Sequence, residues 1–171
     1  MDTIEIMLQG VDMAYIKQDI IKLGEIVHTE EPDKYNLLGI GTCLAIFIFS
    51  KNHQYFSMAH TVLPEKYEGH KINERMPAKY TDLAIKAIIN HFEKKGFNRK
   101  DLCCKIVGGG QIYNDGFSIG ANNIQKAYES LKKEGIPLLS EDVGGKTSRS
   151  ILSFNKDGTI TIRKEGNVFI I

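Results

Sequence analysis

Two segments of the chain carry apolar residues at intervals of three and four, the spacing that places side chains on one face of a helix. They span residues 77–92 and 119–133. Pro77 near the start of the first segment and Gly96 beyond its end are typical of helix boundaries, and Gly135 predicts the end of the second. The inward faces are predicted to consist of Tyr80, Leu83, Ala84, Ala87, Ile88 and Phe92 in the first helix and of Ile124, Ala127, Tyr128 and Leu131 in the second.

Short apolar runs between turn-forming residues predict strands. The longest run, from Leu37 to Phe49, is broken only by Gly39, Gly41 and Thr42, and we interpret it as one strand buried on both faces. Further strands are predicted at 11–17, 55–62, 102–107 and 136–139, in a hairpin formed by 149–155 and 159–164, and at 168–171. The apolar residues between positions 20 and 26 fit either a short helix or another strand.

Strands that alternate with two helices and then end in a hairpin favour a mixed α/β fold over a strictly doubly wound one. We therefore predict a mixed β-sandwich flanked by two main helices. The length of 171 residues suits a single domain, 1–171, with 1–10 and 165–171 at its periphery. That length is enough to bury a hydrophobic core without disulfides or a structural metal.

The composition is that of an ordinary globular protein, with 42% hydrophobic and 25% charged residues. The 22 basic and 21 acidic residues leave a formal net charge of +1, so nucleic acid is not an expected partner. The longest uninterrupted apolar stretch, Leu44 to Phe49, is too short to cross a bilayer, and the N-terminus lacks the pattern of a signal peptide. Three cysteines, two of them adjacent, make no disulfide framework. We expect a cytoplasmic protein with free thiols and no membrane insertion.

Cys43 is the first candidate for chemistry. An unpaired cysteine in an apolar run is more often a core residue than a nucleophile. The glycines before it, Gly39 and Gly41, nevertheless permit close approach of a substrate. Backbone N–H groups from Gly41 through Thr42 to Cys43 can also remain free to stabilise an oxyanion. These residues are therefore predicted to support a reactive thiol.

His60 is the best candidate for a base that activates this thiol. A thiol with a pKa of about 8.5 is mostly protonated at neutral pH and needs a base or a positive neighbour. Among the five histidines only His60 lies in an apolar extended segment, although a hydrogen-bonded core histidine is the commoner role of such a residue. A turn lies between the Cys43 and His60 segments, so antiparallel pairing can bring the two side chains together. His60 is expected to take the Cys43 proton and form an ion pair.

Three other motifs contain residues that occur in metal, redox or phosphate sites. Cys103 and Cys104 point to opposite faces of a predicted strand and lack the C-x-x-C spacing of redox or zinc sites. The segment 108–110, three glycines, lacks the lysine and hydroxyl of a phosphate-binding loop and predicts a flexible loop or tight turn. The acidic pair at 141–142 offers too few ligands for calcium, so we expect a loop that supports the wall of the site, with Arg149 paired to a carboxylate. We expect neither a metal nor an organic cofactor.

Short motifs occur in a fixed order along nearly the whole chain. They are Leu38-Gly39-Ile40-Gly41-Thr42-Cys43, Met58-Ala59-His60 with Leu63-Pro64, Ala78-Lys79-Tyr80 with Asp82, Lys105-Ile106-Val107-Gly108-Gly109-Gly110, Ile119-Gly120 with Asn123, and Glu141-Asp142-Val143-Gly144-Gly145 with Arg149. Each motif alone is short, whereas the ordered set is specific. The set resembles the CheD family of chemoreceptor glutamine deamidases.

The resemblance implies a complete functional description. Cys43 would be the nucleophile and His60 the base that convert glutamine to glutamate through a thioester, on the cytoplasmic helical domain of methyl-accepting chemotaxis receptors. The fold would be similar to the catalytic domain of cytotoxic necrotizing factor toxins, and a CheC-like phosphatase would be a partner. Many members have threonine, thought to orient the histidine, where this chain has Leu37. Members usually have serine where this chain has Thr42 and arginine where it has Asn122. The backbone carbonyl of Leu37 can hold the imidazole instead.

Two other functions remain open from the sequence. The departures at Leu37 and Asn122 are compatible with a chain that only binds and regulates a CheC-like phosphatase. A transglutaminase-like acyltransferase would form the same thioester and pass the acyl group to an amine instead of water.

Overall fold

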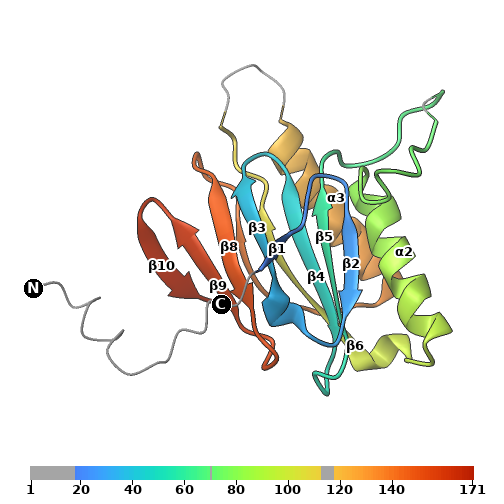
Figure 1. Ribbon diagram of the computed structural model, residues 1–171. Helices are drawn as coiled ribbons and strands as arrows, with labels where there is room; N and C mark the ends of the chain where they lie inside the picture. The colour runs from blue at the N-terminus through green and yellow to red at the C-terminus, as the bar shows by residue number, and fades with distance from the viewer. Residues whose placement is uncertain (1–17, 70, 113–117) are drawn as a thin grey trace, which may run out of the picture.

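The computed structural model describes residues 18–69, 71–112 and 118–171. In this part of the chain two five-stranded sheets pack against each other, and helices α2 (Thr81–Lys94) and α3 (Ile119–Glu134) cover the outer face of one sheet (Figure 1). The predicted mixed α/β architecture with two main helices is thus confirmed for the described residues. Neither of these helices has both the length and the apolar character needed to cross a membrane.

The two sheets are built from strands that are distant in sequence. The first sheet has the order β1 (Asp19–Ile20), β3 (Tyr35–Ile40), β8 (Arg149–Phe154), β9 (Ile160–Lys164) and β10 (Asn167–Ile170). The second has the order β2 (Ile26–Thr29), β5 (Phe56–Thr61), β4 (Leu44–Ser50), β6 (Leu102–Gly108) and β7 (Leu138–Val143). Both sheets are mixed, because β1 pairs in parallel with β3, and β6 with β7.

The prediction of one strand from Leu37 to Phe49 is wrong. The run forms two strands, β3 and β4, which belong to different sheets. Gly39 has a positive φ of 64°, a conformation that L side chains rarely adopt, and residues 41–43 form bends. Both strands are apolar because they face the same inter-sheet core from opposite sides. Cys43 therefore lies in a loop that crosses between the sheets and not within a strand.

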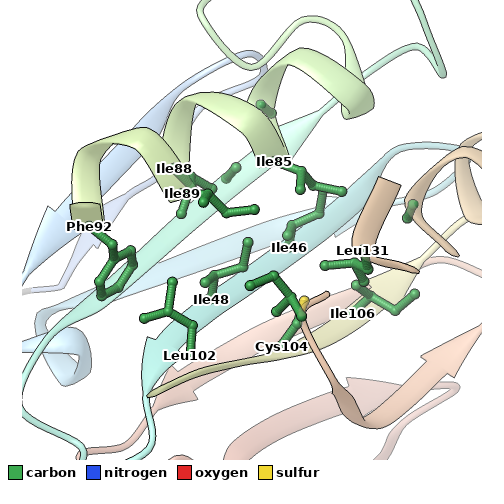
Figure 2. Close-up of a cluster of buried hydrophobic side chains, with 14 of the residues drawn as sticks. Ile46, Ile48, Ile85, Ile88, Ile89, Phe92, Leu102, Cys104, Ile106 and Leu131 are labelled. Carbon is green, nitrogen blue, oxygen red and sulfur yellow. The ribbon is translucent and has the colours of Figure 1, made fainter. Parts of the chain in front are cut away.

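Strand β4 is buried on both faces, because one face meets the helices and the other meets the first sheet. Its alternate residues Leu44, Ile46 and Ile48 pack beneath the helices. Figure 2 shows the side chains of α2 pointing onto this face, where Ile46, Ile48 and Cys104 meet them. Ala45, Phe47 and Phe49 face the inter-sheet core instead, as does Cys103. The prediction that Cys103 and Cys104 point to opposite faces is confirmed.

Helix α2 begins at Thr81 and not at the predicted Pro77. Residues 76–79 form a turn closed by a hydrogen bond from the Lys79 N–H to the Met76 carbonyl, and Tyr80 then pairs with Leu63 in an isolated bridge. The inward face is correct at Ala84, Ile88 and Phe92, but Leu83 is half-buried and Ala87 exposed, while Ile85 and Ile89 are buried. Helix α3 matches its predicted start and ends one residue later, with Gly135 in the left-handed conformation.

The remaining predicted strands are mostly confirmed. The C-terminal hairpin is present as β8 and β9, and β10 adds the expected edge strand. Strand β7 begins later than predicted and runs on to Val143. The ambiguous residues 20–26 contribute to two short strands, β1 and β2, joined through Gly24. The strand predicted at 11–17 lies outside the described residues.

Candidate active site

Cys43 and His60 line the same cavity. His60 lies on β5 directly opposite Ala45 of β4, and Ala45 belongs to the inter-sheet core. Directly paired residues of neighbouring strands share a face, so His60 points to the same side. Cys43 packs against that core as well, two residues before Ala45. The cavity has a volume of about 310 Å³, and its lining consists of Ile20, Ile21, Lys22, Leu23, Leu38, Gly39, Cys43 and His60.

The imidazole of His60 is buried, with an exposed fraction of only 5%. Its Nδ1 lies 3.4 Å from the carbonyl oxygen of Ile21, a long contact that favours a proton on Nδ1. Among the described residues its Nε2 is buried without a hydrogen-bond partner. Burial lowers the pKa of His60, and the Ile21 carbonyl opposes that shift. The ring is therefore a neutral imidazole whose Nε2 lone pair is free to accept a proton.

The carbonyl next to the imidazole is that of Ile21 and not that of Leu37. The side chain of Leu37 is fully buried in the inter-sheet core. The parallel pairing of β1 with β3 is continued by a hydrogen bond from the Ile21 N–H to the Asn36 carbonyl, so Ile21 lies beside this part of β3. The role of Ile21 was not found from the sequence, because its segment gave no clear periodicity.

Cys43 is half-buried and directly precedes the first residue of β4. Burial raises the pKa of its thiol, and its own backbone N–H opposes that shift. Burial shifts the pKa of His60 in the opposite direction. Without a substrate, the neutral thiol and the neutral imidazole are therefore the favoured forms. The ion pair expected from the sequence is therefore disfavoured before a substrate binds. The other two cysteines, Cys103 and Cys104, are buried elsewhere in the sheet and remain protonated, because burial raises the pKa of Cys103 to about 11 and that of Cys104 well above its ordinary value.

The glycines at 108–110 hold the loop that carries Cys43. The Gly109 N–H donates to the Cys43 carbonyl at 2.7 Å, and the Gly110 N–H donates to the Gly41 carbonyl at 2.8 Å. A Cβ on Gly108, whose φ is 123°, would lie 2.4 Å from the same Cys43 carbonyl oxygen. The segment predicted as a flexible loop or tight turn is therefore a close-fitting support beneath the candidate nucleophile.

This support leaves backbone donors free beside the sulfur. In the part of the chain that the structure describes, the N–H groups of Thr42 and Cys43 donate to no other residue's backbone. The Cys43 N–H lies next to its own sulfur. A Cβ on Gly41 would lie 2.6 Å from the side chain of Ile112, so a larger residue there would disturb this loop. Backbone N–H groups that are not used by other backbone carbonyls can stabilise an oxyanion formed by attack of the neighbouring thiol.

Arg149 stabilises the part of the fold that packs against the glycine segment 108–110. Its side chain is fully buried and forms an ion pair with Asp142 at 2.8 Å, and Lys164 approaches the same carboxylate at 3.0 Å. Burial alone would raise the pKa of Asp142, but the hydrogen bonds from Arg149 and Lys164 hold it below its ordinary value. The predicted pairing of Arg149 with a carboxylate is confirmed. Within the described ranges, no three histidine, cysteine or acidic side chains are grouped so as to hold a metal.

The fold and the cavity together define a mixed α/β protein with a cysteine and a histidine at one accessible cavity, an arrangement typical of thiol-dependent enzymes. A family model described as CheD chemotactic sensory transduction matches residues 62–164. The chemoreceptor glutamine deamidase CheD of Thermotoga maritima is 34% identical over 148 residues, which cover 86% of this chain and 92% of that protein. The protein named "Probable chemoreceptor glutamine deamidase CheD" in Methanococcus vannielii is 32% identical over 151 residues, which cover 86% and 96%.

The chain belongs to the CheD family. The segment matched by the family model begins at Val62, so this match does not include Cys43 and His60. The solved structure of the hypothetical protein YfiH from Bacillus licheniformis aligns with 69% of this chain and 50% of that chain, at 13% identity and a TM-score of 0.44. This similarity is too low to assign the fold. The expected similarity to cytotoxic necrotizing factor toxins stays a prediction.

Proposed function

We propose that this chain hydrolyses glutamine side-chain amides in chemoreceptors to glutamate, with Cys43 as nucleophile and His60 as base. One observation carries the proposal: Cys43 and His60 line one cavity, in which the buried Nε2 of His60 has no partner among the described residues. The relatives in Thermotoga maritima and Methanococcus vannielii are named as chemoreceptor glutamine deamidases, which supports this substrate.

The first half of the reaction would form a thioester. As Nε2 of His60 takes the thiol proton, the Cys43 sulfur attacks the amide carbon, and a C–S bond forms while the carbonyl electrons move to oxygen. The N–H groups of Thr42 and Cys43 would stabilise this oxyanion, and one such donor contributes about 3 kcal/mol. His60 then returns its proton to the amide nitrogen, the C–N bond breaks, and ammonia leaves.

The second half would hydrolyse the thioester. His60, neutral again, takes a proton from a water molecule that attacks the acyl carbon. The C–S bond breaks, the carboxylate of glutamate forms, and the sulfur recovers a proton. Atoms balance with water as the only co-reactant, so this route requires neither a metal nor an organic cofactor.

The rim of the cavity suits a protein substrate. Ile20, Leu23 and Leu38 line it and are exposed by 52%, 51% and 48%. Large apolar side chains in contact with water are typical of interaction surfaces. At about 310 Å³ the cavity lies at the small end for ligand sites, which suits a single side chain presented by a larger molecule.

Ammonia release from the cytoplasmic fragment of a chemoreceptor tests the proposal. We expect release by the wild-type chain and loss of release, to the level without enzyme, in Cys43→Ala. Cys103→Ala is the matched control, because Cys103 is buried in the inter-sheet core away from the cavity. Release that survives in Cys43→Ala would overturn the mechanism. Binding to a CheC-like phosphatase without ammonia release would support a regulatory role, and incorporation of an added amine would support an acyltransferase.

A further inference from the structure

Asn123 ties together the two segments that carry Cys43 and His60. It lies in the first turns of α3 and is fully buried. Its side-chain Nδ2 donates to the Thr42 carbonyl at 2.9 Å and to the Val62 carbonyl at 3.0 Å. Thr42 directly precedes Cys43, and Val62 follows His60 by two residues. A single amide group therefore bridges the loop of the candidate nucleophile and the strand of the candidate base.

The helix reaches this position because Gly120 has no side chain. A Cβ on Gly120 would lie 2.5 Å from the Gly109 carbonyl oxygen and 2.7 Å from that of Gly110. The first turn of α3 therefore rests directly on the backbone of the glycine segment, which in turn holds Gly41 and Cys43. This close approach places Asn123, one turn further along the helix, beneath both carbonyls.

Stability alone does not account for a buried asparagine here. Among the described residues its Oδ1 is buried without a hydrogen-bond partner, and an unsatisfied buried acceptor destabilises a fold. The NH₂ group, in contrast, makes two hydrogen bonds of good length, both to carbonyls next to the candidate catalytic segments. The contribution of this residue therefore lies with its two donors.

We propose that Asn123 is a positioning residue that fixes the Cys43 loop relative to the end of the His60 strand, so that sulfur and imidazole face the same cavity. We call its two hydrogen bonds the Asn123 clamp. Its effect on turnover rests on the proposed function, whereas its effect on the Cys43 loop does not. Without the clamp the loop keeps its hydrogen bonds from Gly109 and Gly110 but loses its link to the segment that follows β5, so the sulfur is placed less precisely and becomes more accessible.

The test compares Asn123→Ala with the wild-type chain in two assays. In ammonia release, kcat is expected to fall on the order of 10²-fold with little change in KM, because a misplacement of about 1 Å has that effect on a reacting pair. In labelling with iodoacetamide, followed by mass mapping of the Cys43 peptide, the rate at Cys43 is expected to rise several-fold. A general loss of stability would also raise labelling at the buried Cys103 and Cys104, whereas loss of the clamp should raise it at Cys43 alone.

Ser50→Ala is the matched control. Ser50 is also buried, and its Oγ accepts hydrogen bonds from the Gln54 and Tyr55 N–H groups at the end of β4 away from Cys43. It should lower the melting temperature without changing kcat or Cys43 labelling. If Asn123→Ala does not fold, Asn123→Ser keeps one donor and should give smaller changes in the same directions.

Each outcome decides between the claims. Wild-type kcat and wild-type labelling in a folded Asn123 variant would overturn the clamp. A wild-type chain that releases no ammonia would overturn the proposed function, and the labelling rates would still test the clamp. A labelling rate that rises equally in Ser50→Ala would show general loosening and also overturn it.

Discussion

His60 and His28 lie on paired strands of the same sheet, and burial lowers the pKa of both. His28 faces the helices, where its Nδ1 lies 2.7 Å from the Ser57 hydroxyl and its ring stacks on that of His91 at 3.6 Å. His60 faces the inter-sheet cavity with Cys43, and its Nε2 has no partner among the described residues. A lowered pKa therefore does not by itself single out a candidate base; the free nitrogen in a cavity shared with a thiol favours His60 over His28.

Substitutions of the two histidines should differ most in their effect on ammonia release. His60→Gln is expected to reduce kcat/KM for ammonia release by about 10²–10⁴-fold, the usual contribution of a general base. His28→Gln should stay within a few-fold of wild type, because its partners hold the helix layer and not the cavity. Steady-state ammonia assays on both variants measure this difference. Equal losses in the two variants would mean that the cavity does not distinguish His60.

The surroundings of His60 should matter for substrate binding. Leu38→Glu places a carboxylate on the apolar rim and is expected to raise KM about tenfold, a cost of roughly 1.4 kcal/mol. Leu139→Glu is the matched control, since Leu139 is 57% exposed on the edge strand β7 and does not line the cavity. A KM that rises equally in Leu139→Glu would indicate a non-specific charge effect.

The pH dependence of the free energy of unfolding should distinguish His28 from His60. Its pKa falls from 6.5 to about 4 on folding, chiefly through burial and then through the charges of His91 and Lys95. Between these values the unfolded state binds more protons, so the free energy of unfolding falls as the pH is lowered from about 6.5 towards 4. Because solvent reaches part of the ring, we expect a loss on the order of 1–2 kcal/mol.

Urea unfolding of wild type and His28→Gln at about pH 7 and about pH 4.5 measures this loss, and the variant should lose less stability on acidification. His60 and His91, whose pKa values burial also lowers, contribute in the same direction in both chains. An identical loss in the two chains would show that His28 is not the group responsible.

The sequence predicts those parts of the fold in which periodicity and turn residues agree. Helix α3 has a clear apolar face and a glycine at its end, and the C-terminal hairpin has the turn residues 156–158 between two alternating strands. The apolar run from Leu37 to Phe49 misleads, because two strands that share one core from opposite sides have the same composition as one doubly buried strand. The late start of α2 depends on the turn at 76–79 and on the bridge between Tyr80 and Leu63, which no local pattern shows.

For the candidate site, the sequence supplies the residue types and the structure supplies their supports. Cys43, His60 and Gly41 are predicted as site residues from their surroundings in the chain and from the family resemblance. The carbonyl of Ile21 and the amide of Asn123 act across long sequence separations, through backbone contacts that depend on tertiary packing. Their roles could not be read from the chain, although Asn123 belongs to one of the recognised motifs.

Detection of the thioester tests the central claim most directly. The full-length chain is mixed with a chemoreceptor cytoplasmic fragment, quenched in acid, and analysed by mass spectrometry. We expect a covalent complex between the fragment and Cys43 that hydroxylamine cleaves and that is absent from Cys43→Ala. Ammonia release at an undiminished rate in Cys43→Ala, with no covalent complex in the wild-type chain, would contradict the account.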